Sequence, residues 1–136
     1  MAMTKFVYLK AHKTAMLVID VQRALFTRPT PIFNASNVVR TIKSLAERAH
    51  LYGVLVVYIQ HENKSFLKKD TDGWKLHPDL RPQDSDLSIH KTQGNAFVDT
   101  PLLGALEARG VDNLVVTGLV TQGCVRATSL GAVDIG

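Results

Sequence analysis

Residues 113–128 read NLVVTGLVTQGCVRAT, an apolar strand pattern that runs through a glycine-containing turn into the start of a helix pattern. The turn carries Cys124, the only cysteine of the 136-residue chain. Peptide N–H groups and the positive end of a helix dipole lower the pKa of a thiol from about 8.5. This placement makes Cys124 a candidate nucleophile, although the segment alone fits a buried structural cysteine better, because structural cysteines outnumber catalytic ones.

Alternating strand and helix patterns precede this segment. Residues 15–20 and 54–59 are continuous apolar runs with β-branched side chains, which are typical of buried parallel strands. Between them, apolar residues at helical spacing predict a helix with N-cap residues at 34–37 and a stop at Gly53; its apolar face would consist of Val38, Ile42, Leu45 and Ala49. The irregular stretch 60–88 then predicts a loop over a pocket.

Two further elements complete the pattern before residue 113. Residues 87–91 predict a short strand, and Thr100-Pro101 offers an N-cap and a first-turn proline for a helix that ends at Gly110. The order strand-helix-strand-strand-helix-strand-helix predicts an α/β fold with a largely parallel sheet and right-handed crossovers.

Three reactive side chains follow strands of this predicted sheet. Asp20 closes the first strand, Lys91 closes the third, and Cys124 follows the fourth. Ligands bind beyond the carboxyl ends of the strands in such sheets. Taken singly, Asp20 fits a turn acid and Lys91 fits a surface lysine. Because Asp20, Lys91 and Cys124 all lie at the same edge of the predicted sheet, a functional site is the better interpretation.

Composition excludes several classes of protein. A content of 46% hydrophobic residues suits a single domain spanning 1–136 with one sizeable core. One cysteine permits neither an internal disulfide nor a four-thiolate zinc site, which fits a reducing, cytoplasmic setting. The first ten residues contain no long apolar segment, and no stretch approaches the roughly 20 apolar residues of a membrane span.

The net charge of +4 is spread over the chain, apart from a small group at Lys64, Lys68 and Lys69. We interpret this group as a solvated face rather than a nucleic-acid footprint. The sequence therefore predicts neither a membrane nor a nucleic-acid partner.

Three blocks of sequence together resemble the isochorismatase-like cysteine hydrolases, a family that includes nicotinamidases and N-carbamoylsarcosine amidase. The blocks are LVIDVQ at 17–22 with Phe26, KTQGNAF at 91–97 with Thr100 and Leu102, and VTGLVTQGCV at 116–125. The resemblance implies a three-layer, Rossmann-like parallel sheet with helices on both faces. It also implies an Asp–Lys–Cys triad at Asp20, Lys91 and Cys124.

The resemblance further implies a cis peptide bond at Leu119–Val120, with the backbone N–H groups of Val120 and Cys124 forming an oxyanion hole. The implied activity is hydrolysis of a small amide or carbamoyl compound through a thioester, without a cofactor. We expect the substrate pocket to be lined by Phe26, Gln60, His61, Trp74 and Phe97, although core packing explains the three aromatic residues equally well.

No metal ligand set is expected. Nicotinamidases present an Asp-x-His pair after the second strand, whereas residues 58–62 here read YIQHE. His61 and His77 could still meet at a metal, but two histidines without a third ligand at suitable spacing fit a polar pocket wall better.

Two features depart from the family pattern. Asn95 stands where many relatives have serine, which is expected to change the polarity of the pocket. The chain ends at Gly136, where relatives continue into at least one more strand and a helix. The domain is thus expected to be C-terminally short, with an open edge on the fourth strand and a homo-oligomer that restores the missing burial.

Two other functional classes stay open. A non-catalytic or scaffold homologue would act by binding or oligomerisation, and a redox-responsive thiol protein would use an exposed Cys124 without a resolving cysteine.

Overall fold

Four parallel strands form the centre of the computed structural model, which describes residues 10–30 and 32–136. The predicted absence of a leader in the first ten residues falls almost entirely outside this range. The strands are β1 (Thr14–Ile19), β2 (Leu55–His61), β3 (Leu87–Lys91) and β4 (Asn113–Gly118), in the order β3-β2-β1-β4. The chain therefore builds outward from β1 in one direction and then returns to place β4 on the other side of β1. The predicted parallel sheet is confirmed.

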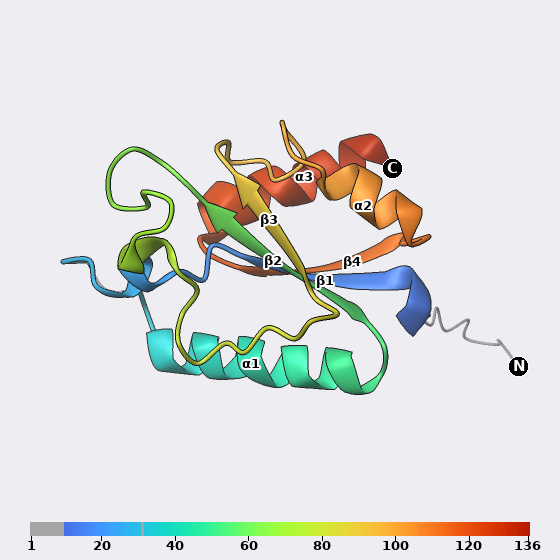
Figure 1. The fold of residues 1–136 in the computed structure, drawn as a ribbon, viewed down its shortest axis with the longest axis horizontal. Coiled ribbons are helices and arrows are strands. Elements are labelled where there is room, and N and C mark those ends of the chain that lie inside the picture. Colours follow the sequence, from blue (N-terminus) through green and yellow to red (C-terminus); the bar gives the residue numbers. More distant parts are fainter. Residues whose placement is uncertain (1–9, 31) are drawn as a thin grey trace, which may run out of the picture.

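Helices cover both faces of the sheet (Figure 1). The helix α1 (Ala35–Leu51) packs on one face, and α2 (Leu102–Ala108) and α3 (Arg126–Ile135) lie over the other. All six residues of β1 are buried, because this strand is covered on both faces and paired on both edges. The three-layer architecture expected from the resemblance is confirmed.

The core is divided between the two faces by the alternation of side chains along the strands. Val18 and Tyr58 face α1, where they meet Val39 and Ile42. Leu17, Ile19 and Ile59 face the opposite side, where they pack with Ile89, Leu102 and Leu106.

The helix boundaries differ from the prediction by a few residues. The helix α1 begins at Ala35 with Asn34 at the N-cap, and its buried face consists of Val39, Ile42, Ala46 and Ala49. Leu45 was predicted on this face but is 38% exposed, because it lies at the border of the buried face, next to Ala46. The helix α2 begins at Leu102, with Pro101 rather than Thr100 at the N-cap position.

Short irregular elements fill the connections. The 3-10 segments are Ala11–Lys13, Arg23–Phe26 and Asp72–Trp74, and a π-type turn at Thr121–Val125 precedes α3. Cys124 therefore lies in the turn before the helix, not in the helix itself. Among the described residues, no helix combines the length and apolar character needed to cross a bilayer.

Gly118 allows β4 to end against β1. Its φ is +122°, and a Cβ at this position would collide with the backbone of Ile19. The next residue, Leu119, donates its N–H to the Ile19 carbonyl at 2.8 Å. Only glycine permits this close approach, which brings the turn containing Cys124 beside the residue that follows β1.

Candidate active site

The carboxyl ends of three strands converge on the ammonium group of Lys91. Its Nζ lies 3.3 Å from Asp20 Oδ2 and donates to Cys124 Sγ at 3.1 Å. Lys91 is 1% exposed and Asp20 is 4% exposed. The predicted meeting of these three side chains is therefore seen in the structure, at the point where strand order reverses between β1 and β4.

Lys91 reaches this point from two strands away. It ends β3, whereas Asp20 follows β1, and β2 lies between them. Adjacent strands are about 4.8 Å apart, so a long side chain is needed to span the distance. The Lys91 stem lies over the end of β2, where its register partner is His61.

His61 is the fourth group of the site. Its Nδ1 lies 2.9 Å from Lys91 Nζ and accepts one of the ammonium protons. Burial, followed by the positive charge of Lys91, lowers the pKa of His61, so the imidazole is neutral at pH 7 and carries its proton on Nε2. Sequence reasoning placed His61 in the pocket but did not find this contact.

Gln22 is the residue that sequence reasoning missed. It is fully buried, and its amide bonds to both backbone groups of His61: Nε2 donates to the carbonyl at 2.9 Å, and Oε1 accepts from the N–H at 3.0 Å. Nε2 also donates to the Trp74 carbonyl at 2.8 Å. The only signal in the sequence was the position of Gln22 in the block 17–22.

Electrostatics around the thiol differ from the prediction. Burial, and after it a hydrogen bond and charge interaction with Asp20, raise the pKa of Cys124, while Lys91 lowers it. The net direction is upward, so the predicted low pKa is wrong for the ligand-free site. The reason is that the half-buried thiol borders a carboxylate as well as an ammonium, and a negative neighbour disfavours the thiolate.

The turn around the thiol has the expected backbone. The Leu119–Val120 peptide bond is cis. The Val120 carbonyl accepts from the N–H groups of Gly123 at 3.0 Å and Val125 at 3.4 Å, which closes the turn. Among the described residues, no backbone carbonyl accepts from the Val120 N–H.

One oxygen of the Asp20 carboxylate also has no hydrogen-bond partner among the described residues. This oxygen, Oδ1, is buried. A carboxylate oxygen in this condition is able to take a proton from a neighbouring group or to accept a hydrogen bond from a bound molecule.

The remaining predicted pocket residues divide into two groups. Gln60 and Trp74 lie near the His61 end of β2, since Gln60 Nε2 donates to the Trp74 carbonyl at 3.1 Å. Phe26 instead packs against the core on the α1 face, with its ring 4.8 Å from the ring of His77. The ring of His77 thus pairs with Phe26, and within the described part of the chain no hydrogen bond or ion pair joins His77 to His61.

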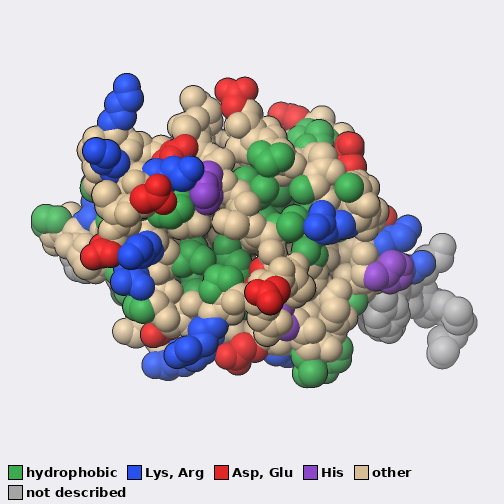
Figure 2. Space-filling view, in the orientation of Figure 1, with side chains coloured by type: hydrophobic (Ala, Val, Ile, Leu, Met, Phe, Trp, Pro, Cys, Tyr) green, Lys and Arg blue, Asp and Glu red, His purple; other side chains and the backbone are tan. Residues whose placement is uncertain are grey.

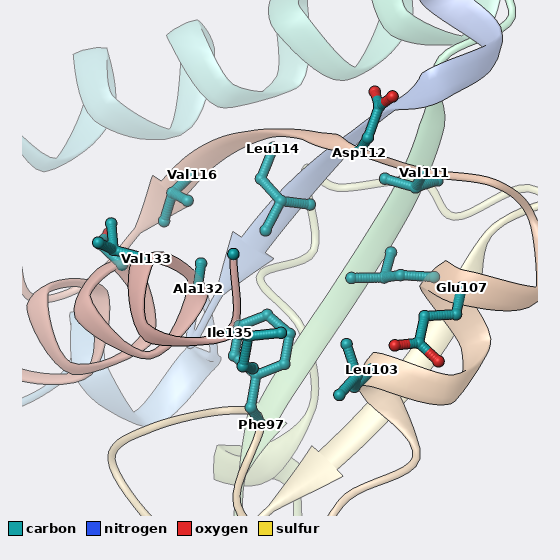
Figure 3. A pocket seen from close by; sticks show the side chains of 13 residues that line it. Phe97, Leu103, Glu107, Val111, Asp112, Leu114, Val116, Ala132, Val133 and Ile135 are labelled. Atoms are coloured by element: carbon teal, nitrogen blue, oxygen red, sulfur yellow. The ribbon is translucent and has the colours of Figure 1, made fainter.

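Phe97 and Asn95 lie in the segment that joins β3 to α2. Phe97 lines an apolar cavity of about 460 Å³ between α2, β4 and α3, which contains neither Asp20, Lys91 nor Cys124 (Figure 3). Asn95 packs against Gly131 of α3, and its Oδ1 accepts from the Phe97 N–H at 3.0 Å. Asn95 therefore stabilises the loop that joins β3 to α2, and its expected effect on the polarity of the pocket stays a prediction.

A metal would compete with Lys91 for the site. Ligand atoms of Asp20, His61 and Cys124 lie within 4.8 Å of one another, a spacing that could suit a cation. However, the Lys91 ammonium already binds all three side chains at 2.9–3.3 Å. A second positive charge among these ligands would be repelled, so the donor set does not fit a metal while Lys91 is protonated.

Comparisons with known proteins agree with this geometry. Residues 14–136 match a family model described as "Isochorismatase domain". The chain is 34% identical to a streptothricin hydrolase of Streptomyces noursei over 124 residues, covering 90% of this chain and 45% of that protein. It is 31% identical to the uncharacterized isochorismatase family protein YddQ of Bacillus subtilis, covering 90% of this chain and 71% of that protein. The chain thus spans about half the length of the streptothricin hydrolases it matches.

Solved structures show the same fold. N-carbamoylsarcosine amidase from Thermoplasma acidophilum superposes with a TM-score of 0.82 at 26% identity, over 90% of this chain and 77% of that one. An isochorismatase-like hydrolase from Alkaliphilus metalliredigens gives a TM-score of 0.83 at 28% identity, over 90% of this chain and 74% of that one.

Proposed function

Because the chain belongs to the isochorismatase family, we propose that it hydrolyses the C–N bond of a small amide or carbamoyl compound, with Cys124 as the nucleophile. One observation carries the proposal: Lys91 Nζ binds Asp20 Oδ2 at 3.3 Å and Cys124 Sγ at 3.1 Å in a buried position. This arrangement joins a nucleophile, a base and a fixed positive charge, as covalent catalysis requires.

The first half of the reaction forms a thioester. Asp20 takes the thiol proton, and Cys124 Sγ bonds to the substrate's carbonyl carbon. The Val120 and Cys124 N–H groups hold the resulting oxyanion, and the unpartnered Val120 N–H supports this role. Asp20 then returns its proton to the leaving nitrogen as the C–N bond breaks.

The second half releases the acid. Asp20 removes a proton from water, and the hydroxide attacks the thioester carbon. The S–C bond breaks, and the proton held by Asp20 returns to the sulfur. Lys91 keeps a positive charge beside both the carboxylate and the sulfur throughout, which favours whichever of the two is negative.

His61 contributes a donor to the same site. Its Nδ1 is occupied by Lys91, so Nε2–H is free to bond a substrate oxygen. We place Gln60 and Trp74 in the pocket wall beside it, and leave Phe26 and Phe97 in the core.

The relatives support this class of reaction. They include ureidoacrylate amidohydrolase of Caulobacter vibrioides, 29% identical over 153 residues, as well as the amidase described above. A cytoplasmic location and a homo-oligomeric state stay predictions, drawn from the single cysteine and from the resemblance.

A hydrolytic screen tests the proposal. Small amides and carbamoyl compounds are incubated with the protein, and ammonia or amine release is measured for the native chain, Cys124→Ala and Asp20→Asn. We expect Cys124→Ala to reduce turnover more than about 1000-fold without loss of fold, because covalent catalysis is removed while only one sulfur atom is deleted.

A lysine remote from the site provides the control. Lys10→Gln, at the amino end of β1, should match the native chain in rate. Equal rates for Cys124→Ala and the native chain would contradict the proposal and favour the non-catalytic alternative.

A further inference from the structure

A second cavity lies where the loops after β2 and β3 leave the sheet. It has a volume of about 560 Å³ and is lined by Glu62, Asn63, Lys64, Lys68, Lys69 and Thr92. Glu62 directly follows His61, and Thr92 directly follows Lys91. This cavity, called the lysine cavity below, therefore borders the carboxyl ends of the two strands that carry His61 and Lys91.

The lining of the lysine cavity is positively charged. It contains three lysines and one acid, Glu62. Among the described residues, none of the ion pairs includes Lys64, Lys68 or Lys69. In Figure 2, Lys and Arg side chains lie among Asp and Glu side chains on the side of the molecule where the loop after β2 lies in Figure 1. Three lysines that line one cavity and form no ion pair with the described residues, against one acid, raise the local potential for anions.

The loop that carries the lysines is anchored to the sheet. The Asn63 side chain accepts from the Ser65 and Leu67 N–H groups at 3.0 and 2.9 Å, and the Asn63 N–H donates to the Leu67 carbonyl at 3.1 Å. Leu67 is buried at 3% exposure between Lys64 and Lys68. The Glu62 N–H also donates to the Lys91 carbonyl at 2.8 Å, which joins this loop to the strand that bears the catalytic lysine.

We propose that the lysine cavity binds a carboxylate of the substrate, so that the preferred substrate is an acidic amide rather than a neutral one. The proposal rests on the function proposed above, because the cavity is lined by the residues that directly follow His61 and Lys91 in the chain. Ammonium groups bind carboxylates with short, charge-assisted hydrogen bonds, and they also speed the approach of an anion. Glu62 lies on the His61 side of the cavity, where its charge acts against an anion that approaches the triad too closely.

Succinamate and succinamide provide a matched pair of substrates, since they differ only in a carboxylate against an uncharged amide. We expect the native chain to favour succinamate at least tenfold in kcat/KM. In a Lys64→Gln, Lys68→Gln, Lys69→Gln variant this ratio should fall to near one, chiefly through KM. The three side chains are exposed, so the variant should fold, and a thermal melt checks this.

A binding measurement separates this proposal from the catalytic one. Titration calorimetry with succinate on the Cys124→Ala chain requires no turnover. We expect the triple variant to bind succinate at least tenfold more weakly, Glu62→Gln to bind it more tightly, and Lys10→Gln to match the parent. Added salt should weaken the binding.

The outcomes distinguish the two proposals. Lysine-dependent succinate binding without hydrolysis of any amide would sink the catalytic proposal and leave the anion site standing. Hydrolysis with equal succinate affinity in the parent and the triple variant, or with no succinate binding, would overturn the lysine cavity. A succinamate preference that survives the triple variant would overturn it as well.

Discussion

Asp20 and Lys91 act on the pKa of Cys124 in opposite directions. The carboxylate favours the neutral thiol, so Asp20→Asn should lower the thiol pKa even as it removes the catalytic base. The ammonium favours the thiolate, so Lys91→Met should raise the pKa further. The rate of iodoacetamide labelling between pH 6 and pH 10 measures both shifts.

Lys10→Gln, which lies at the other end of the sheet, is the control for this titration. A thiol pKa below about 8.5 in the native chain, or a shift of the same sign in both site variants, would show that Asp20 does not control the sulfur. Lys91→Met also leaves Asp20 as an unpaired buried charge, a loss that typically costs about 3–5 kcal/mol. Asp20→Asn alone still decides the sign if Lys91→Met fails to fold.

Asp20, Lys91 and Cys124 could be found from the sequence because each one ends or follows a predicted strand, the carboxyl ends of parallel strands share an edge, and the three blocks that contain them resemble the family. The role of Gln22 could not. Its side chain bonds to backbone groups 39 positions away, and a contact of this kind leaves no periodicity in the sequence. The same is true of the His61–Lys91 hydrogen bond, which joins neighbouring strands only after the register is set.

At the scale of elements, the junction between β4 and the cysteine turn depends on one glycine. Gly118→Ala combines a positive φ of 122° with a collision against Ile19, and should lower the free energy of unfolding by about 3–5 kcal/mol. Gly110→Ala is the matched control, because its φ is +65° but nothing lies within 4 Å of an added Cβ. It should cost only about 1–2 kcal/mol, the usual penalty of the left-handed region.

Urea unfolding of both variants measures the difference. Equal losses for the two alanines would mean that conformational strain alone matters at Gly118, and that the close approach to β1 is relieved by a small backbone shift.

The two central strands, β1 and β2, were predicted well because each is a continuous apolar run that is covered on both faces. Their exact ends were not, since β2 extends through Gln60 and His61, which are polar but held by long-range hydrogen bonds. The sequence also did not show on which face of the sheet each aromatic residue packs. Phe26 and Phe97 lie within the blocks that resemble the family, yet they pack on opposite faces of the sheet, and the pattern of either segment contains no sign of this.

For the whole molecule, the position of Lys91 predicts a metal-independent enzyme. The purified protein should contain less than one equivalent of zinc, iron or manganese, and a chelator should leave the rate of amide hydrolysis unchanged. Elemental analysis and a rate measured after dialysis against EDTA check this. One tightly bound metal per chain would contradict this prediction, because it would show that a metal can displace the Lys91 ammonium group from Asp20, His61 and Cys124.

The order of the strands has a consequence for synthesis of the protein. Of the four described strands, β1 is made first and lies between β2 and β4, and β4 is made last. A nascent chain that has emerged through β3 already holds Asp20, His61 and Lys91, but its sulfur is still inside the ribosome. Because Cys124 reaches Asp20 and Lys91 only after β4 docks beside β1, a chain translated only as far as β3 lacks the complete triad. The proposed hydrolysis should therefore begin only after all four of these strands have assembled.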